Sequence, residues 1–403
     1  MKCVCRLCGG ERLSPLLDMG RHPIAHHFVL NPSQNEYKHP VKMYFCDACG
    51  LVQLIDPVPS HMLYKKYVCL SSWKPQPHIP RLLTLIDELP NINKNSRIVE
   101  VGCNDGVFLN ALRDAGFTHL FGIEPAEDAF VVAQTRGFSV VNAFFDRALA
   151  DTLVSAQGQY DLLITRQVME HIPNLQSFCD GIMRLVKPGG YVLIEVPHFD
   201  FIVEVADYSA IWEEHVNYFF QKTLHHLLAK YNIRVIREET SNFSGEALVV
   251  IGRNGDRMEF CNAMAPLEDL RSAVMAFSER WPRFRDGLLG FLKIHHNQGK
   301  KIAIYGAGCR AISLINFTGM TPFIEFVVDD QLEKQGKFIP GSRLPILPSA
   351  ALEEKSIDLC LLAVNAENET KVISQHSVFE ARGGEFVSLL PPSSLLPPFW
   401  KTL

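Results

Sequence analysis

Apolar positions in the middle of the chain mark a strand, a glycine loop and a helix in close succession. The run from Ile98 to Val101 is mostly β-branched and ends at Gly102, which predicts a buried strand that breaks into a loop. We expect a helix directly after this loop, where apolar residues resume at Phe108. About twenty residues further on, a second apolar run ends at Glu124. This order of strand, glycine loop, helix, strand and acid predicts half of a mononucleotide-binding unit.

The same alternation of strand and helix continues along the chain and predicts a parallel α/β sheet. Further strands of this sheet are expected at residues 140–141, 160–167, 191–197 and 241–251, and the last is predicted to be a returning edge strand. A long helical stretch at 264–296 then leads into a second α/β pattern, with strands at 301–305, 359–364 and 385–389.

The length of 403 residues is enough for two or three domains. An aromatic segment that runs into Pro75 and Pro77 is interpreted as a linker before the first sheet. We predict a small N-terminal domain over residues 1–75, an α/β domain over 76–253 and a second, Rossmann-like α/β domain over 254–403.

The first glycine loop reads E-x-G-x-N-D-G from Glu100 to Gly106. Its glycines permit positive φ and a close approach of the backbone to a ligand. A dinucleotide site would show G-x-G-x-x-G, and the acids here would repel a pyrophosphate. The spacing instead resembles motif I of the S-adenosylmethionine-dependent methyltransferases, whose cofactor carries a cationic sulfonium; a plain structural turn or another nucleotide ligand is the alternative. The residues predicted to bind S-adenosylmethionine are Glu100, Gly102, Cys103, Asn104, Asp105, Gly106, Glu124, Pro125, Phe144, Arg166 and Gln167.

Two C-x-x-C-G motifs near the N-terminus predict a structural zinc site formed by Cys5, Cys8, Cys46 and Cys49. Four thiolates complete a tetrahedral shell and leave no position for a catalytic water. The 37 residues between the pairs, from 9 to 45, exceed the usual zinc-ribbon spacing. Cys3 could therefore replace Cys5, and one of three histidines could join the ligands, although a solvated or substrate-facing loop is the preferred interpretation for each of them: His22, His26 and His27.

A candidate general base lies beyond the last parallel strand of the first sheet. His215 follows Glu214 in an aromatic segment, and the pKa of histidine lies near working pH. The alternative is a helix N-terminus whose acids favour its dipole.

The second glycine loop, Gly306-Ala-Gly308-Cys-Arg-Ala, fits G-x-G-x-x-A, with Asp329 about twenty residues later. By itself this pattern is weak evidence for a dinucleotide, because the same turn binds other nucleotides or merely packs a helix on a strand.

The composition excludes several classes of partner. A net charge of −5 gives no basic footprint for nucleic acid. No apolar run is long enough to cross a membrane, and the N-terminus lacks the apolar core of a signal peptide. Eleven cysteines, an odd number spread through expected core strands, suit a reducing compartment. We expect a cytoplasmic monomer.

Over essentially its whole length the chain resembles the bacterial sugar C-methyltransferases that act on nucleotide-linked keto-deoxysugars. The shared motifs are the C-x-x-C-G pairs, Tyr67 before Ser71-Ser72, E-x-G-C-N-D-G, Glu170-His171-Ile172, E-H-x-x-Y-F at 214–219 and V-D-D-x-x-x-K-Q-G-K-x-x-P-G at 328–341. The resemblance implies a class I methyltransferase core between a zinc-binding domain and a Rossmann-like domain that helps to hold the substrate's nucleotide, which argues against bound NAD.

The resemblance also implies a chemistry. A carbon next to a keto group, here C-3 of a 4-keto-deoxyhexose, must lose a proton before it can accept a methyl group. His215 matches the base that removes this proton, and Glu214, His171 and Tyr67 match residues that orient the base and stabilise the enolate. The predicted substrate-binding residues are Trp212, Asn217, Tyr218, Tyr305, Gly306, Asp329, Lys337, Pro340 and Gly341.

The chain departs from the family in two places. Trp212 and Glu213 stand where the family usually has tyrosine and histidine, so a phenolic contact to the keto group is missing. The sequence Gly308-Cys-Arg310 replaces an Ala-x-Lys-like sequence. These changes keep open a second hypothesis, a nucleotide-sugar or NAD-binding protein without methyltransferase activity.

Overall fold

The structure, a computed structural model, describes residues 3–64, 76–255 and 267–403. The chain divides into two compact units that each combine distant segments. The first contains Met1–Pro15, Tyr44–Asp200 and Glu214–Arg271, and the second contains Leu16–Met43, Phe201–Glu213 and Ser272–Leu403. The three-domain division at residues 75 and 253 stays a prediction.

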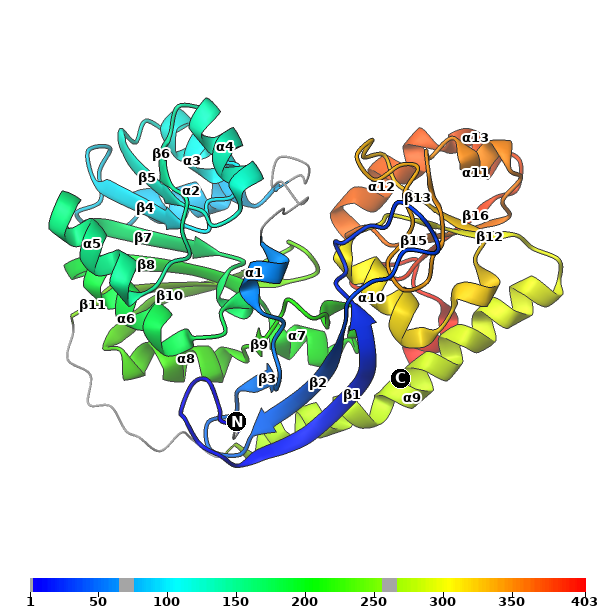
Figure 1. The fold of residues 1–403 in the computed structure, drawn as a ribbon, viewed down its shortest axis with the longest axis horizontal. Coiled ribbons are helices and arrows are strands. Elements are labelled where there is room, and N and C mark those ends of the chain that lie inside the picture. The colour runs from blue at the N-terminus through cyan, green and yellow to red at the C-terminus, as the bar shows by residue number, and fades with distance from the viewer. Residues whose placement is uncertain (1–2, 65–75, 256–266) are drawn as a thin grey trace. The chain divides into compact units, whose positions relative to one another are not determined.

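A seven-stranded sheet forms the centre of the first unit, with the strand order β10-β11-β8-β7-β4-β5-β6 (Figure 1). Strands β8, β7, β4, β5 and β6 are parallel, and β11 runs antiparallel to both of its neighbours. The strands are β4 (Arg97–Val101), β5 (His119–Ile123), β6 (Ser139–Val141), β7 (Tyr160–Arg166), β8 (Val186–Pro197), β10 (Ile233–Ser241) and β11 (Ala247–Asn254). The predicted α/β class with a parallel methyltransferase-type sheet is confirmed.

Helices cover both faces of this sheet because successive side chains of each strand point to opposite faces. Ile98 of β4 belongs to an apolar core with α2 and α3, whereas Val99 and Val101 belong to a core with α5, α6 and α8. The helical elements up to residue 230 are α1 (Ser60–Leu63), α2 (Ile79–Asp87), α3 (Val107–Asp114), α4 (Glu127–Thr135), α5 (Arg147–Gln157), α6 (Leu175–Leu185), α7 (Phe199–Glu204), α8 (Gln221–Lys230) and the 3-10 turns η2 (Met169–His171) and η3 (Tyr208–Ala210).

The predicted edge strand at 241–251 is wrong in its position. The structure places β11 inside the sheet, between β8 and β10, and β10 forms the edge. In β11 seven of eight residues are buried, as expected of an internal strand, whereas β10 alternates between buried or half-buried and exposed residues. The charged residues of β10, such as Arg237 and Glu239, hide its strand pattern in the sequence.

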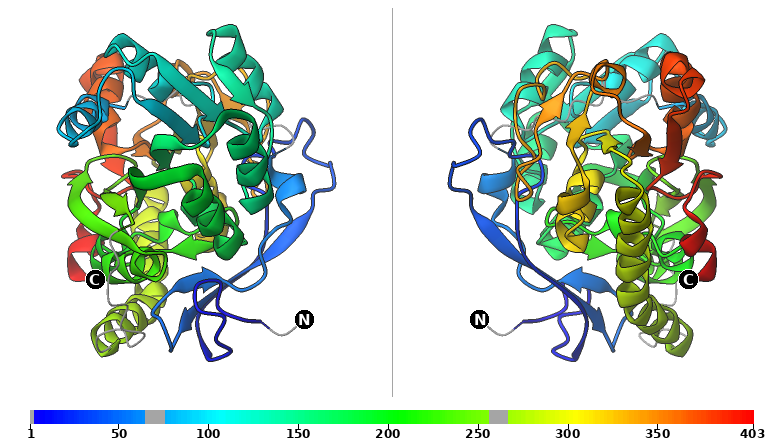
Figure 2. Two further views of the ribbon diagram at one scale, coloured as in Figure 1. Left: turned by 90° about the vertical axis from the view of Figure 1, so that its left-hand side faces the viewer. Right: turned by 90° about the vertical axis from the view of Figure 1, so that its right-hand side faces the viewer.

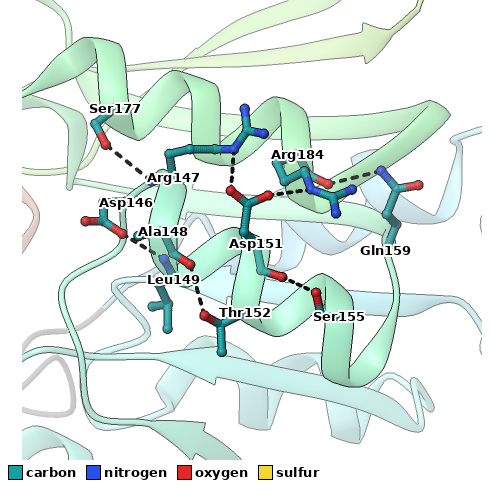
Figure 3. Close-up of polar contacts among 10 residues, drawn as sticks. All are labelled: Asp146, Arg147, Ala148, Leu149, Asp151, Thr152, Ser155, Gln159, Ser177 and Arg184. Carbon is teal, nitrogen blue, oxygen red and sulfur yellow. Dashed lines mark hydrogen bonds and ion pairs between the residues drawn. The ribbon is translucent and has the colours of Figure 1, made fainter.

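Helix α5 is fixed to its neighbour α6 by a polar network (Figure 3). The Asp146 side chain caps α5 by accepting a hydrogen bond from the Leu149 amide at 2.8 Å. Asp151 accepts from Arg147 at 2.9 Å and from Arg184 of α6 at 2.7 Å. Most of these side chains are half exposed, so the cap is expected to stabilise α5 more than the ion pairs do.

Replacing Asp146 with alanine is expected to lower the free energy of unfolding by about 1 kcal/mol, because the first-turn amide loses its acceptor. Thr152→Ala on the same helix is the control, since this exposed hydroxyl donates to the Ala148 carbonyl within the helix. Urea unfolding of both variants measures the difference, and equal stability of the two would show that the cap contributes nothing.

A small sheet has the order β1-β2-β3-β9. Its strands are β1 (Leu13–Pro23), β2 (Lys38–Cys46), β3 (Val52–Leu54) and β9 (Asn217–Tyr218). Strands β3 and β9 pair antiparallel, with Gln53 opposite Asn217. This pairing joins the segment that follows the second cysteine pair to the segment that follows His215.

The second unit has a five-stranded parallel sheet in the order β14-β13-β12-β15-β16. Figure 2 shows α9 as one continuous helix that leads toward this sheet. The remaining elements are α9 (Glu268–Asn297), β12 (Ile302–Tyr305), α10 (Cys309–Thr318), η4 (Thr321–Phe323), β13 (Phe326–Val328), β14 (Ile346–Leu347), α11 (Ala351–Glu354), β15 (Leu359–Leu362), α12 (Ala366–Gln375), α13 (Ser377–Ala381), β16 (Glu385–Ser388) and η5 (Pro398–Thr402). The predicted second α/β pattern is thus present.

Candidate active site and metal centre

The four predicted metal-binding cysteines lie together. Their sulfur atoms are all within 4.8 Å of one another, with Cys5–Cys49 at 3.4 Å and Cys8–Cys46 at 3.6 Å. Zinc–sulfur bonds of about 2.3 Å in a tetrahedron place sulfurs about 3.8 Å apart, so the cluster fits zinc closely. The glycine after each pair adopts positive φ, which explains the C-x-x-C-G motif.

The alternative metal ligands lie outside this cluster among the described residues. Cys3 is exposed, and His22 contacts the Met19 carbonyl and the Phe317 ring. His26 is only 2% exposed, so a solvated loop is the wrong interpretation for it, whereas its neighbour His27 is exposed.

Arg6 connects the first cysteine pair to the candidate catalytic segment. Its guanidinium donates to the Val216 carbonyl at 2.9 Å and to the Leu54 carbonyl at 2.5 Å, and its amide donates to the Gln53 side chain at 3.0 Å. The zinc module therefore supports the backbone directly after His215. Sequence reasoning missed Arg6, because nothing in a C-R-L-C motif indicates what its arginine contacts.

The first glycine loop has the conformation that its sequence predicts. Gly102 and Gly106 have φ values of 74° and 79°. A Cβ atom on Gly102 would lie 2.4 Å from the Val168 side chain, so this position requires glycine on two grounds. The Glu124 carboxylate accepts hydrogen bonds from the Asn104 and Ala126 amides, both at 2.8 Å. Glu124 thereby fixes the loop and the start of α4 to the end of β5.

Two buried acids surround this loop. Burial raises the pKa of Glu100 to about 8 and that of Glu124 to about 7. One Glu100 oxygen has no hydrogen-bond partner among the residues that the structure describes. Asp105 is fully buried beside Arg136, at 3.5 Å. A cationic ligand with hydroxyl donors would stabilise the ionised forms of Glu100 and Glu124.

The other predicted cofactor residues have different environments. Cys103 is buried, the Pro125 carbonyl accepts from Asn142 at 3.0 Å, and Phe144 is 50% exposed. Arg166 and Gln167 both donate to Glu195, at 3.0 and 3.1 Å.

Glu195 is a further buried acid that the sequence did not single out. Burial opposes its ionisation, but Arg166 and His78 lower its pKa to about 2. Glu195 therefore holds the end of β7 as an ionised anchor for Arg166 and Gln167.

Two histidines face each other at the end of the parallel sheet. His171, on η2, donates from Nδ1 to the Glu214 carbonyl at 3.1 Å, which leaves its Nε2 for other contacts. The rings of His171 and His215 are 4.8 Å apart and nearly perpendicular, at 82°. His215 is 5% exposed and Glu214 1%. The fold thus brings His171 against the Glu214-His215 segment, and the catalytic roles of these residues stay predictions.

Hydrogen bonds to backbone carbonyls hold the segment after His215 against η2. The Val216 amide donates to the Glu170 carbonyl at 2.7 Å, and the Asn217 side chain donates to the carbonyls of Met169 and Ile172 at 3.0 and 2.8 Å. Asn217 and Tyr218 are buried in β9, and their predicted roles in substrate binding stay predictions. The alternative of a helix N-terminus at 211–219 is wrong, because this segment runs from η3 into β9.

The surroundings of His171 include residues that sequence reasoning did not place there. The Tyr64 ring lies 6.3 Å from His171 and 6.0 Å from Phe144. Glu170, next to His171, is 1% exposed, and one of its carboxylate oxygens lies within 4.8 Å of a ring nitrogen of His171 and of one of His215. The shared motif Glu170-His171-Ile172 is the feature of the sequence that could have indicated Glu170 as a site residue. Tyr67, the fourth predicted catalytic residue, lies outside the described residues.

Several of the predicted substrate-binding residues of the second unit form hydrogen bonds to other residues of that unit. Asp329, the acid of the dinucleotide-like pattern, accepts from the Ala307 amide at 2.8 Å and from Lys334 at 2.9 Å. Tyr305 donates to Asp330 at 2.5 Å. Gly306 has a φ of 106°, and a Cβ there would lie 2.8 Å from the Ala363 carbonyl oxygen.

The P-G end of the specific string is also fixed within this unit. The Pro340 carbonyl accepts from Asn316 at 3.0 Å, and the Gly341 amide donates to Glu36 at 3.0 Å. Lys337 is half-buried and has no carboxylate partner in the part of the chain that the structure describes. The other lysine of this string, Lys334, pairs with Asp329, so among the described residues Lys337 is the lysine of the string whose charge is not paired with a carboxylate.

Both departures from the family pattern have local partners in the second unit. Trp212 is half-buried, and the Glu213 carboxylate accepts from the Ala25 amide at 2.6 Å. Arg310 donates to Asp207 at 2.5 Å and to Ser209 at 3.0 Å. Glu213 and Arg310 thus stabilise the fold itself.

Three family models match the chain in succession. A zinc binding domain matches residues 5–64, a methyltransferase domain matches 76–238, and a C-methyltransferase C-terminal domain matches 265–391. The C-methyltransferase NovU of Streptomyces niveus is 27% identical over 402 residues, covering 96% of this chain and 95% of NovU. The chain belongs to the S-adenosylmethionine-dependent C-methyltransferase family.

Two further comparisons cover a part of this C-methyltransferase. A ubiquinone biosynthesis O-methyltransferase of Bordetella avium is 34% identical over 125 residues, 30% of this chain and 52% of the relative. A solved methyltransferase structure from Mesorhizobium loti is 14% identical, and the match covers 44% of this chain and 97% of that structure, with a TM-score of 0.34. None of the described helices is long and apolar enough to cross a membrane.

The C-methyltransferase uses S-adenosylmethionine and carries a zinc site, and the residues present fit both. Replacing Glu124 with alanine is expected to weaken S-adenosylmethionine binding about tenfold to a hundredfold, because the predicted charge-assisted hydrogen bonds from Glu124 to the ribose would be lost. Because the pKa of Glu124 is raised to about 7, wild-type affinity should also increase as the pH rises from about 6 to about 8.

Calorimetric titration measures both effects, and Glu127→Ala, an exposed acid in the first turn of α4, is the matched control. Unchanged affinity in the Glu124 variant would remove this residue from the ribose site.

Proposed function

We propose that this C-methyltransferase transfers a methyl group to the carbon alpha to the keto group of a nucleotide-linked sugar, at C-3 of a 4-keto-deoxyhexose. The observation that carries the proposal is the contact between the half-buried His171 and the buried His215 at the end of the methyltransferase sheet. The likeness to a C-methyltransferase over nearly the whole chain supports it.

Methylation at carbon requires a base, because a carbon alpha to a keto group becomes nucleophilic only after it loses a proton. S-adenosylmethionine supplies an electrophilic methyl group when bound. We assign the proton abstraction to His215, because histidine is the side chain that most often serves as a general base. Removal of the proton leaves an enolate whose charge lies mainly on the former keto oxygen.

His171 is suited to stabilise that enolate. Its Nδ1 hydrogen bond to the Glu214 carbonyl fixes the ring, and a protonated His171 would present Nε2–H as a donor to the enolate oxygen. Glu214 is proposed to orient His215, its neighbour in the chain, and Tyr67 to assist at the keto group. Arg6 holds the following backbone carbonyl and so limits movement of the base.

The nucleotide is assigned to the second unit. Lys337 provides a cation without a carboxylate partner among the described residues, and the loop at Gly306 precedes the N-terminus of α10, where amides favour phosphate. Asp329, Tyr305, Pro340 and Gly341 are proposed to shape this site, and Trp212, Asn217 and Tyr218 to contact the sugar.

The test is methyl transfer to two matched substrates. A nucleotide-linked 4-keto-deoxyhexose is expected to gain one methylene in mass, whereas the same sugar with the keto group reduced to an alcohol should not react. The proposal predicts this difference because only the ketone acidifies the neighbouring carbon. Equal methylation of the alcohol would indicate an oxygen acceptor and contradict the proposal.

A further inference from the structure

Glu170, His171 and His215 form a second cluster with metal-binding geometry. One ligand atom from each of the three residues lies within 4.8 Å of the other two. Among the described residues, the four-cysteine cluster is the other group of this kind. The zinc binding domain model matches residues 5–64 and therefore does not cover this second cluster.

The Glu170 carboxyl group is an independent sign of a missing ligand. It is 1% exposed, and neither of its oxygens has a hydrogen-bond partner among the residues that the structure describes. A buried carboxyl group without partners is costly, and nearly all such groups in folded proteins are satisfied by protein, water or an ion. A metal ion bound between the two histidines would satisfy it.

The ligand set selects the class of ion. Two imidazoles and one carboxylate suit Zn²⁺, Co²⁺ or Ni²⁺, whereas Mg²⁺ and Ca²⁺ prefer oxygen ligands alone. His171 donates its Nδ1 hydrogen to the Glu214 carbonyl, the outer contact that orients many metal-binding histidines and leaves Nε2 for the ion. Three protein ligands would leave further positions for water.

We propose that Glu170, His171 and His215 bind one borderline divalent transition-metal ion and that this ion inhibits methyl transfer by occupying the base nitrogen of His215. The inhibition rests on the proposed function, whereas the binding does not. The ion and the substrate proton then compete for the same lone pair. A rise in the concentration of the free transition-metal ion would inhibit methyl transfer without displacing the structural zinc.

Cobalt titration of the zinc-loaded protein tests the binding. We expect one Co²⁺ per chain with weak visible bands and no intense thiolate charge-transfer band, while elemental analysis finds the zinc retained. Glu170→Gln should weaken Co²⁺ binding about tenfold or more, since even an outer contact changes affinity that much. His225→Ala, which removes a partly exposed histidine 2.6 Å from Glu238, should bind as the wild type does.

Two results would overturn the proposal: cobalt found only in the thiolate site, or equal cobalt binding in wild type and Glu170→Gln. If Glu170→Gln does not fold, His171→Ala serves as the second variant with the same expected loss. Activity is measured in parallel, and methyl transfer should fall as the cobalt bands rise and return after chelation. Cobalt binding in a protein that transfers no methyl group under any condition would count against the proposed function and leave the metal site standing.

Discussion

Replacing His215 with alanine is expected to lower the turnover number for methyl transfer by about 10²- to 10⁴-fold, the usual contribution of a positioned general base. His215 is 5% exposed and its ring lies 4.8 Å from that of His171, so water cannot easily replace it. Affinity for S-adenosylmethionine should stay close to that of the wild type, because the glycine loop and Glu124 are unchanged. Steady-state kinetics and calorimetry on the same preparation measure the two quantities.

His225→Ala is the matched control for this variant, since His225 is partly exposed and pairs with Glu238 on the surface. Its turnover should equal that of the wild type. Retained turnover in His215→Ala would show that another group removes the proton. A combined loss of turnover and cofactor binding would indicate a folding defect instead of a catalytic one.

Replacing Cys46 with serine is expected to prevent stable folding of the first unit. Structural zinc contributes about 10–16 kcal/mol in small zinc domains, as much as the whole stability of an ordinary domain. Cys46 is fully buried and shares an apolar core with Leu51 and the helix α8. Loss of the site would also release Arg6, whose guanidinium holds the Val216 carbonyl beside His215.

Zinc content and the melting temperature measure this effect, with Cys3→Ser as the control. Cys3 is exposed and lies outside the four-cysteine cluster, so its replacement should change neither quantity. A Cys46→Ser protein that keeps its zinc and its melting temperature would show that the metal is held elsewhere.

Local chemistry made much of the fold predictable. The β-branched run before Gly102 and the acid at 124 correctly predicted β4, the glycine loop and β5, because these features depend on near neighbours in the chain. Strand β10 was not predicted, since its charged residues follow from its place at the sheet edge. That place is decided by tertiary packing, which a local pattern does not contain.

The candidate site was predictable to a different degree. Motifs pointed to His171 and Glu214-His215, but 43 positions separate His171 from Glu214, and only the fold brings them to a 3.1 Å contact. Glu170 and Arg6 were missed because their roles depend on what surrounds them: a carboxyl group without a partner among the described residues in one case, and two carbonyl oxygens in the other. The contacts of Asp329 with Lys334 and of Arg310 with Asp207 could not be predicted either, although the sequence motifs singled out Asp329 and Arg310.

The position of the transferred methyl group tests the central claim most directly. The purified protein is incubated with a nucleotide-linked 4-keto-deoxyhexose and S-adenosylmethionine labelled with ¹³C in its methyl group, and the product is analysed by NMR. We predict a labelled methyl carbon bonded to the ring carbon next to the ketone, with no label on oxygen. A labelled methyl ether, or a sugar recovered without label while the protein binds S-adenosylmethionine, would contradict the account.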